Sequence, residues 1–206
     1  MRPVLGILTA AMWVLLMATP VKADAALIDI GRLVAKNAMV CADFIQSKSL
    51  RVLKRPLISK GNLKFVVEEG ILWQVRVPFP TQVLVKKDAL IRWNDDGQPR
   101  RLSFESNPVF GALSRVFLAV FRGEISALRD VFEIQSEVGP SNWRMSLTPR
   151  DDRLGSVIAQ ISASGGRFLH ELHIQEGNGD RTLIKFNNVN AEPCRLSTHE
   201  KRYFAE

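Results

Sequence analysis

The histidines and the paired acidic residues are the side chains of this 206-residue chain that could transfer protons or bind a metal ion. His170 and His173 lie three positions apart in a segment whose alternating pattern predicts a strand. We therefore expect them to project to opposite faces and not to share a metal ion. His199 lies in a polar C-terminal stretch. The histidines thus predict no metal centre.

The acidic pairs lie where the sequence predicts turns. They occupy positions 68–69, 95–96 and 151–152, and their neighbourhoods favour exposed hairpin ends. Residues 164–166 (SGG) are typical of a tight turn, and no glycine-rich phosphate-binding loop is present. Because no nucleophile with a base and no metal cluster assembles, we predict a protein that is not an enzyme and needs no cofactor.

Two cysteines, Cys41 and Cys194, are the remaining reactive side chains. An oxidising compartment favours a disulfide between them, which would tie an early segment to the C-terminal tail. The alternative is two separate buried thiols, because geometry decides whether two distant cysteines can pair.

The N-terminus supports such a compartment. Arg2 precedes an apolar run at 4–18 and a polar exit at 19–23, the pattern of a secretory signal peptide. We predict a signal peptide at 1–23 and a single domain at 24–206, with cleavage after Ala25 as an alternative. An uncleaved anchor is the other alternative, but the run is shorter than the ~20 residues that span a membrane. Removal of Arg2 and Lys22 leaves 26 basic and 21 acidic residues, a net charge of +5, and export argues against a nucleic-acid partner.

The apolar pattern predicts a mainly β domain with few helices. Apolar residues recur at helical spacing over 26–40, and a second helical block spans 107–121, followed by a shorter one at 124–131. The 107–121 block is apolar nearly all round, so it must be covered on more than one side. Alternation elsewhere predicts an antiparallel meander of about ten or eleven strands with one apolar face. The clearest strand is 71–77, and alternation resumes after the helical blocks at 132–138, 142–148, 156–163, 167–175 and 180–187.

A sheet of this size with one apolar face, and with so few helices to cover that face, must curve so that the apolar face encloses an interior. Its interior could be a solid aromatic core or a cavity. Composition alone does not separate the two.

Five segments resemble the outer-membrane lipoprotein carrier family LolA, in the family's order and spacing. They are 44–46 (FIQ), 60–65 (KGNLKF), 71–73 (ILW) with Pro78, 107–110 (NPVF) and 143–149 (WRMSLTP). The similarity covers roughly residues 26–190. No single motif is decisive.

The resemblance implies an incomplete antiparallel β-barrel with an N-terminal helix and a helical lid. It also implies a monomeric periplasmic carrier that takes acylated lipoproteins or lipids from an inner-membrane ABC transporter to an outer-membrane acceptor similar to LolB. The acyl chains would lie between sheet and lid. The lining expected from the strands comprises Phe44, Phe65, Trp73, Val75, Val77, Val85, Trp93, Trp143, Met145, Leu147, Ile184 and Phe186; the lid would add Phe110, Leu113, Phe117 and Phe121.

One position departs from the family pattern. The family's second strand typically ends in an arginine followed by proline, and that arginine latches the lid, whereas Val67 stands at the matching position here. The lid is then held differently, or the cargo differs, as in divergent LolA-like proteins of fatty-acid or polyene lipid pathways. A lipid-sensing or interaction module on the same fold is the alternative function.

Overall fold

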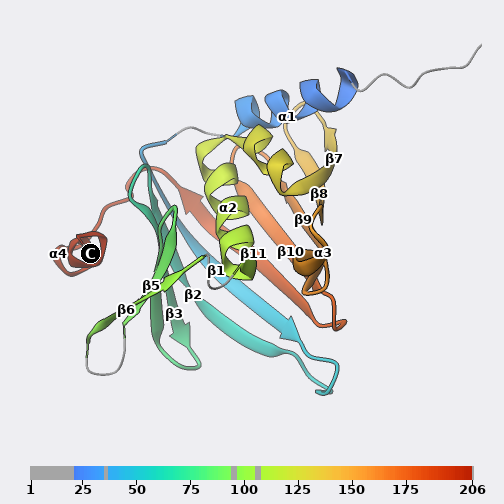
Figure 1. Ribbon diagram of the computed structural model, residues 1–206. Helices are drawn as coiled ribbons and strands as arrows, with labels where there is room; N and C mark the ends of the chain where they lie inside the picture. Colours follow the sequence, from blue (N-terminus) through green and yellow to red (C-terminus); the bar gives the residue numbers. More distant parts are fainter. Residues whose placement is uncertain (1–20, 35–36, 94–96, 105–107, 206) are drawn as a thin grey trace, which may run out of the picture.

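The computed structural model describes residues 21–34, 37–93, 97–104 and 108–205, arranged as one curved antiparallel sheet with helices on both sides (Figure 1). The sheet has 11 strands in the order β6-β5-β4-β3-β2-β1-β11-β10-β9-β8-β7. Strands β6 and β7 end the order without pairing to each other, so the sheet does not close. The predicted incomplete barrel is confirmed.

Consecutive strands pair, except that β1 pairs with β11 in the middle of the sheet. The strands are β1 (Met39–Ser49), β2 (Leu57–Val66), β3 (Gly70–Val77), β4 (Thr81–Val85), β5 (Ala89–Trp93), β6 (Pro99–Ser103), β7 (Phe132–Val138), β8 (Trp143–Pro149), β9 (Ile158–Gly165), β10 (Leu169–Glu176) and β11 (Arg181–Asn190).

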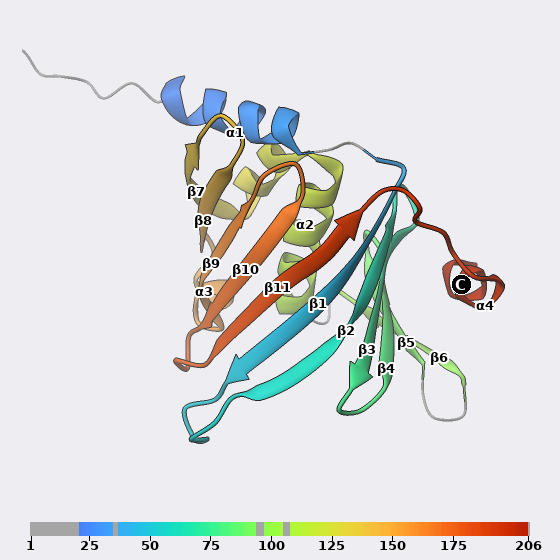
Figure 2. The same cartoon turned by 180° about the vertical axis from the view of Figure 1, so that it is seen from behind.

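The helices lie at three places on this sheet. Helix α2 (Pro108–Arg122) lies inside the curve, and α1 (Val21–Leu33) crosses one end near β7 (Figures 1 and 2). Helix α4 (Thr198–Phe204) packs on the convex side. Two short helices, η1 (Ile125–Asp130) and α3 (Asp152–Gly155), connect α2 to β7 and β8 to β9.

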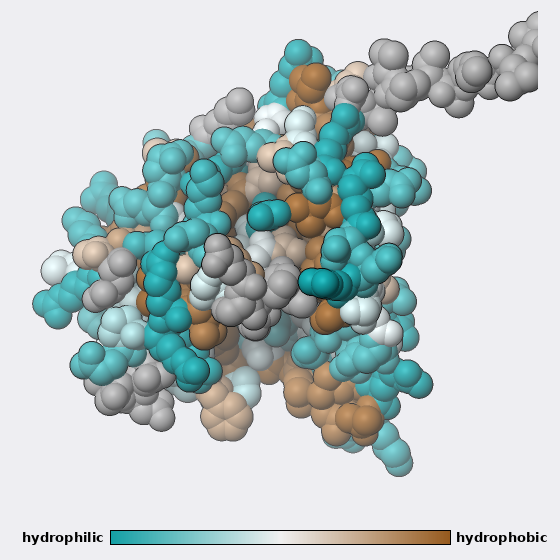
Figure 3. Space-filling view, viewed as in Figure 1, coloured by the Kyte–Doolittle hydropathy of each residue, from teal (hydrophilic) through white to brown (hydrophobic). Residues whose placement is uncertain are grey.

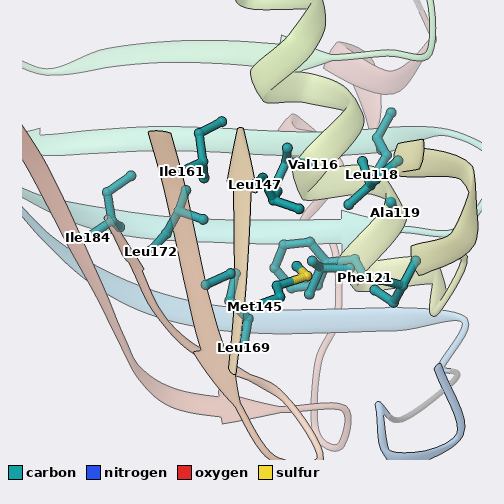
Figure 4. Close-up of a cluster of buried hydrophobic side chains, with 14 of the residues drawn as sticks. Val116, Leu118, Ala119, Phe121, Met145, Leu147, Ile161, Leu169, Leu172 and Ile184 are labelled. Atoms are coloured by element: carbon teal, nitrogen blue, oxygen red, sulfur yellow. The ribbon is translucent and has the colours of Figure 1, made fainter. Parts of the chain in front are cut away.

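Alternation along the strands separates the concave core from solvent. In β8 the side chains of Trp143, Met145 and Leu147 are buried, while Arg144 and Thr148 are exposed. The buried set meets α2, and Figure 4 shows Val116 and Phe121 beside these strand residues. The one-sided pattern in the sequence therefore positions the sheet's apolar face toward α2.

The predicted helix at 26–40 ends too late. Helix α1 ends at Leu33, and β1 begins at Met39, opposite Val66 of β2. Val40, Ala42 and Phe44 are all buried at alternate positions, so strand pairing and burial decide the conformation there. Leu27, Ile30 and Val34 are buried, as the helical spacing predicts.

The predicted signal peptide lies largely outside the described residues, and its cleavage stays a prediction. Helix α1 begins at Val21, so it includes the last three residues of that segment. No helix in the described ranges is long and apolar enough to cross a bilayer.

Candidate functional site

Trp73 lies at the centre of an aromatic group between the sheet and α2. Its ring stacks on Phe44 of β1, with centroids 3.9 Å apart, and meets the edge of Phe186 of β11 at 6.3 Å. Phe117 of α2 completes the group, 5.7 Å from Trp73 and 6.4 Å from Phe186. The neighbouring ring pair, Phe65 and Phe121, is stacked at 5.3 Å. Aromatic contacts thus join α2 to strands from the middle of the sheet.

Helix α2 is buried on several sides, as its apolar sequence predicts. Ala112, Val116, Ala119 and Val120 are buried, and even Ser114 is almost inaccessible. Arg115 is the exposed position in the middle of the helix. The helix therefore contacts the protein over much more than one face, and the contacts with the sheet are almost wholly apolar.

Buried apolar side chains from α2 and from the sheet pack against each other on the concave side in this conformation. The use of this space by an acyl chain stays a prediction. A cavity of about 680 Å³ opens beside the first turns of α2, and its lining combines apolar residues such as Phe104 and Leu154 with charged ones such as Asp88, Arg115 and Arg150. It lies where strands β6 and β7 leave the sheet unclosed. Room for a long hydrocarbon chain beneath α2 requires the helix to move.

Most of the lining residues that the sequence predicts belong to the apolar cluster between α2 and the sheet, which we call the concave cluster. These residues are Phe44, Phe65, Trp73, Val75, Val85, Leu113, Phe117, Phe121, Trp143, Met145, Leu147, Ile184 and Phe186.

Two predicted lining residues lie elsewhere. Val77 pairs with Lys60, whereas Val75 pairs with the next residue, Gly61, so an irregularity in the pairing places Val77 on the opposite face from Val75. Its side chain is 53% exposed. Trp93 faces the convex side, because it lies two positions after Ile91, which pairs with the convex residue Leu84. The side chain of Phe110 lies outside the described residues.

The convex face carries a second apolar cluster that the sequence reading missed. Val66, Leu72, Leu84 and Ile91 are buried there beneath Tyr203 and Phe204 of α4. Because of Leu72, Leu84 and Ile91, their strands are apolar on both faces. This pattern in the sequence predicts that the convex face is also covered by another part of the chain.

Covalent and polar links hold the C-terminal segment on this face and stabilise the start of α4. A disulfide joins Cys41 of β1 to Cys194, the pairing considered from the sequence, with Cα atoms 5.5 Å apart. The Nζ of Lys64 donates to Glu200 at 2.7 Å. Ser197 and Glu200 form a reciprocal capping box at the start of the helix. The C-terminal segment is thus a fixed part of the sheet's outer layer.

Burial by itself raises the pKa of Glu200, but hydrogen bonds from Lys64 and Ser197 outweigh it and hold that pKa below its usual value. The hydrogen bond with His173 likewise lowers the pKa of Glu171, despite some desolvation. Both groups form ordinary structural ion pairs. Neither lies on the concave face.

The prediction that His170 and His173 face opposite sides of the sheet is wrong. Both are exposed, because an irregularity in pairing between Leu169 and Glu171 shifts the phase of β10. In the part of the chain that the structure describes, no group of His, Cys, Asp or Glu residues could hold a metal ion.

Val67 does not replace the family's latch. Its side chain is 37% exposed, and its backbone N–H donates to the carbonyl of Ala38 rather than to α2. At the end of α2, the Nε of Arg122 is buried without a hydrogen-bond partner. An unsatisfied buried donor costs about 1–3 kcal/mol.

An unclosed antiparallel sheet with an apolar helix on its concave face defines a carrier-type fold. The sequence model described as "Outer membrane lipoprotein carrier protein LolA-like" matches residues 17–191. The chain belongs to this LolA-like family.

Solved structures share this fold at low sequence identity. A LolA superfamily protein from Nitrosomonas europaea superposes with a TM-score of 0.51 at 9% identity, covering 84% of this chain and 94% of that one. A domain described as an outer-membrane lipoprotein-sorting protein, from Vibrio parahaemolyticus, gives 0.50 at 11% identity, covering 89% and 100%. Comparison with curated protein sequences finds no match.

Proposed function

We propose that the protein is a periplasmic carrier that binds the acyl chains of lipoproteins or lipids between α2 and the concave face and moves them from the inner to the outer membrane. The observation that carries this proposal is the apolar contact between α2 and the sheet around Trp73. An acyl chain offers the same kind of surface as the side chains of α2. It can therefore replace them when the helix moves aside.

Burial of hydrocarbon contributes about 0.8 kcal/mol per methylene. This burial would offset the contacts that α2 loses when it moves from the sheet. The carrier itself makes and breaks no covalent bond. Its role is to keep the acyl chain out of water between a donor and an acceptor.

The partners follow from this role. An inner-membrane ABC transporter would supply the cargo, and an outer-membrane acceptor similar to LolB would receive it. Export through the signal peptide predicted at 1–23 would place the chain in the periplasm, where the disulfide between Cys41 and Cys194 is stable.

Quenching of Trp73 by a brominated fatty acid tests the proposed site directly. Bromine quenches an indole that it approaches closely, and Trp73 lies where the acyl chain would enter. We expect strong quenching in the wild type and a marked decrease in Trp73→Phe, where any remaining quenching comes from Trp143 of the same cluster. Trp93→Phe is the matched control, because Trp93 packs against Tyr203 on the convex side.

Native mass spectrometry of the purified protein shows whether lipid is already bound. An unquenched wild type, or quenching that survives Trp73→Phe and vanishes in Trp93→Phe, would refute the site. Movement of the bound chain to acceptor vesicles then separates a carrier from a lipid-sensing module, which would hold its ligand.

A further inference from the structure

Two neighbouring hairpins expose large apolar side chains at the end of the sheet opposite α1 (Figures 1 and 3). Val52 is 88% exposed in the β1–β2 hairpin, and Phe79 is 80% exposed in the β3–β4 hairpin. The hairpins are adjacent because β2 pairs with β3, with Lys60 opposite Val77. We name this region the tip surface; its apolar members are Val52, Leu53, Leu57, Ile58, Val77 and Phe79.

The β1–β2 hairpin extends past its neighbours on both sides. Strand β2 begins at Leu57, three residues before its first pairing with β3, and β11 reaches only to Ser49 of β1. Its base is fixed, because the backbone N–H of Arg51 donates to Asp180 at 2.9 Å and its guanidinium donates to the carbonyl of Asn178. The exposed apolar residues therefore lie on a hairpin that extends beyond the neighbouring strands and is fixed at its base by hydrogen bonds.

The apolar residues of this hairpin face more than one direction. Leu57 and Ile58 are consecutive in β2, so they point to opposite faces of the strand, yet both are exposed. Packing of one face against a flat protein surface would leave the other in water. Insertion of the whole tip into an apolar medium buries both.

The charged residues of the β1–β2 hairpin itself are all basic. Residues 48–60 contain five basic residues and no acidic one, and Arg76 lies three residues before Phe79. Lys48 pairs with Glu176, and Asp180 accepts the hydrogen bond from Arg51, so the nearby acids lie at the base of the hairpin. Lys54 and Arg55 are exposed within the loop itself. Apolar residues ringed by basic ones are typical of segments that enter the interface of an anionic bilayer.

We infer that the tip surface docks the protein on anionic membranes, with Val52, Leu53 and Phe79 entering the interface and Lys54 and Arg55 contacting lipid phosphates. This inference goes beyond the proposed acyl-chain site, because the tip surface lies outside the concave cluster. It specifies the surface that meets the bilayer. A protein partner with an acidic surface is the competing occupant.

Co-sedimentation with vesicles tests the inference on the purified chain. We expect binding to phosphatidylglycerol–phosphatidylethanolamine vesicles, little binding to phosphatidylcholine vesicles, and weakening by salt. The double variant Val52→Ser, Phe79→Ser should reduce the partition coefficient at least tenfold, because each side chain loses apolar burial. Lys54→Gln with Arg55→Gln should reduce it roughly twenty-five-fold, about fivefold for each charge.

Matched substitutions elsewhere provide the controls. Ile28→Ser replaces an exposed apolar residue of α1, and Lys201→Gln with Arg202→Gln removes two exposed charges of α4. Both should leave the partition coefficient unchanged, and any contribution of the N-terminal apolar run is common to all variants.

Wild-type protein that stays unbound to anionic vesicles would overturn the inference and assign the tip to a protein partner. Binding that survives both tip variants, or that ignores lipid charge and salt, would also overturn it. Quenching of Trp73 in the tip variants keeps the two proposals separate. The tip variants should bind brominated fatty acid from solution as the wild type does. A variant that loses only vesicle binding therefore tests the tip surface and not the acyl-chain site.

Discussion

Replacing Phe117 by alanine is expected to strengthen acyl-chain binding, although it removes an apolar side chain from the proposed site. Phe117 lies on α2, and its ring meets the edges of Trp73 and Phe186 on the sheet. These contacts hold α2 on the concave face. An acyl chain needs the same face, so closure of α2 competes with binding.

The size of the effect follows from the two ring contacts. An edge-to-face pair contributes about 0.5–1.5 kcal/mol beyond the area that it buries, so loss of both destabilises the closed position by about 2 kcal/mol. Where the open state is the minor one, the apparent dissociation constant is the intrinsic constant divided by the open fraction. A change of about 2 kcal/mol raises that fraction roughly thirtyfold. Loss of contact between the ring and the bound chain offsets part of this, and we expect a net gain of about tenfold.

Titration with a fluorescent fatty acid measures the change. Phe79→Ala is the matched control, because it makes the same substitution at an exposed residue remote from α2 and should leave the affinity unaltered. Urea unfolding of both variants shows whether each remains folded. If folded Phe117→Ala protein binds the probe no better than wild type, closure of α2 does not oppose binding and the reasoning fails.

Three further predictions concern the scaffold. Replacing Cys41 and Cys194 by serine should lower the free energy of unfolding by about 5 kcal/mol, since the disulfide closes a loop of 153 residues in the unfolded chain; unchanged urea denaturation would contradict this. Because the pKa of Glu200 is lowered in the folded state, the ionised Glu200 side chain stabilises the folded protein. This contribution is fully present above the ordinary carboxyl pKa of about 4.3 and is lost as the pH falls through the lowered value. Glu200→Gln should therefore be less stable than wild type at neutral pH, with the difference shrinking in acid, as read from urea midpoints against pH. Gly61→Ala should destabilise by about 3 kcal/mol, because its Cβ would lie 1.9 Å from the carbonyl oxygen of Gln74, whereas Gly155→Ala meets open space and should change the melting temperature little.

The sequence predicted the sheet well because its alternation is strong. Trp143, Met145 and Leu147 could be assigned to one face from their spacing alone, and that face is the buried one. The apolar composition of α2 likewise predicted cover on several sides. Both features follow from the spacing of apolar residues within one segment of the sequence, and neighbouring strands in the sheet have the same spacing.

Features that depend on distant pairing were harder to predict. The end of α1 was placed too late, because pairing of Met39 with Val66 cannot be read from local helical spacing. Trp93 was assigned to the wrong face, since the register between β4 and β5 decides where it points. The position of α4 required knowledge that Leu72 and Leu84 lie next to each other on the convex side.

The two faces of the sheet carry different mechanical roles in the proposed mechanism. On the convex side, the disulfide and the ion pair between Lys64 and Glu200 fasten α4 across strands β2–β5, so this half keeps its shape when the concave side changes. On the concave side, α2 ends at Arg122 and is followed by Gly123, whose φ of 71° allows a sharp change of direction that other residues resist. Gly31 of α1 lies so close to that point that an added Cβ would be 2.6 Å from the Gly123 carbonyl oxygen. In the proposed mechanism, movement of α2 about Gly123 would therefore disturb the contact of α1 with this turn as well as the ring contacts of Phe117 with the sheet.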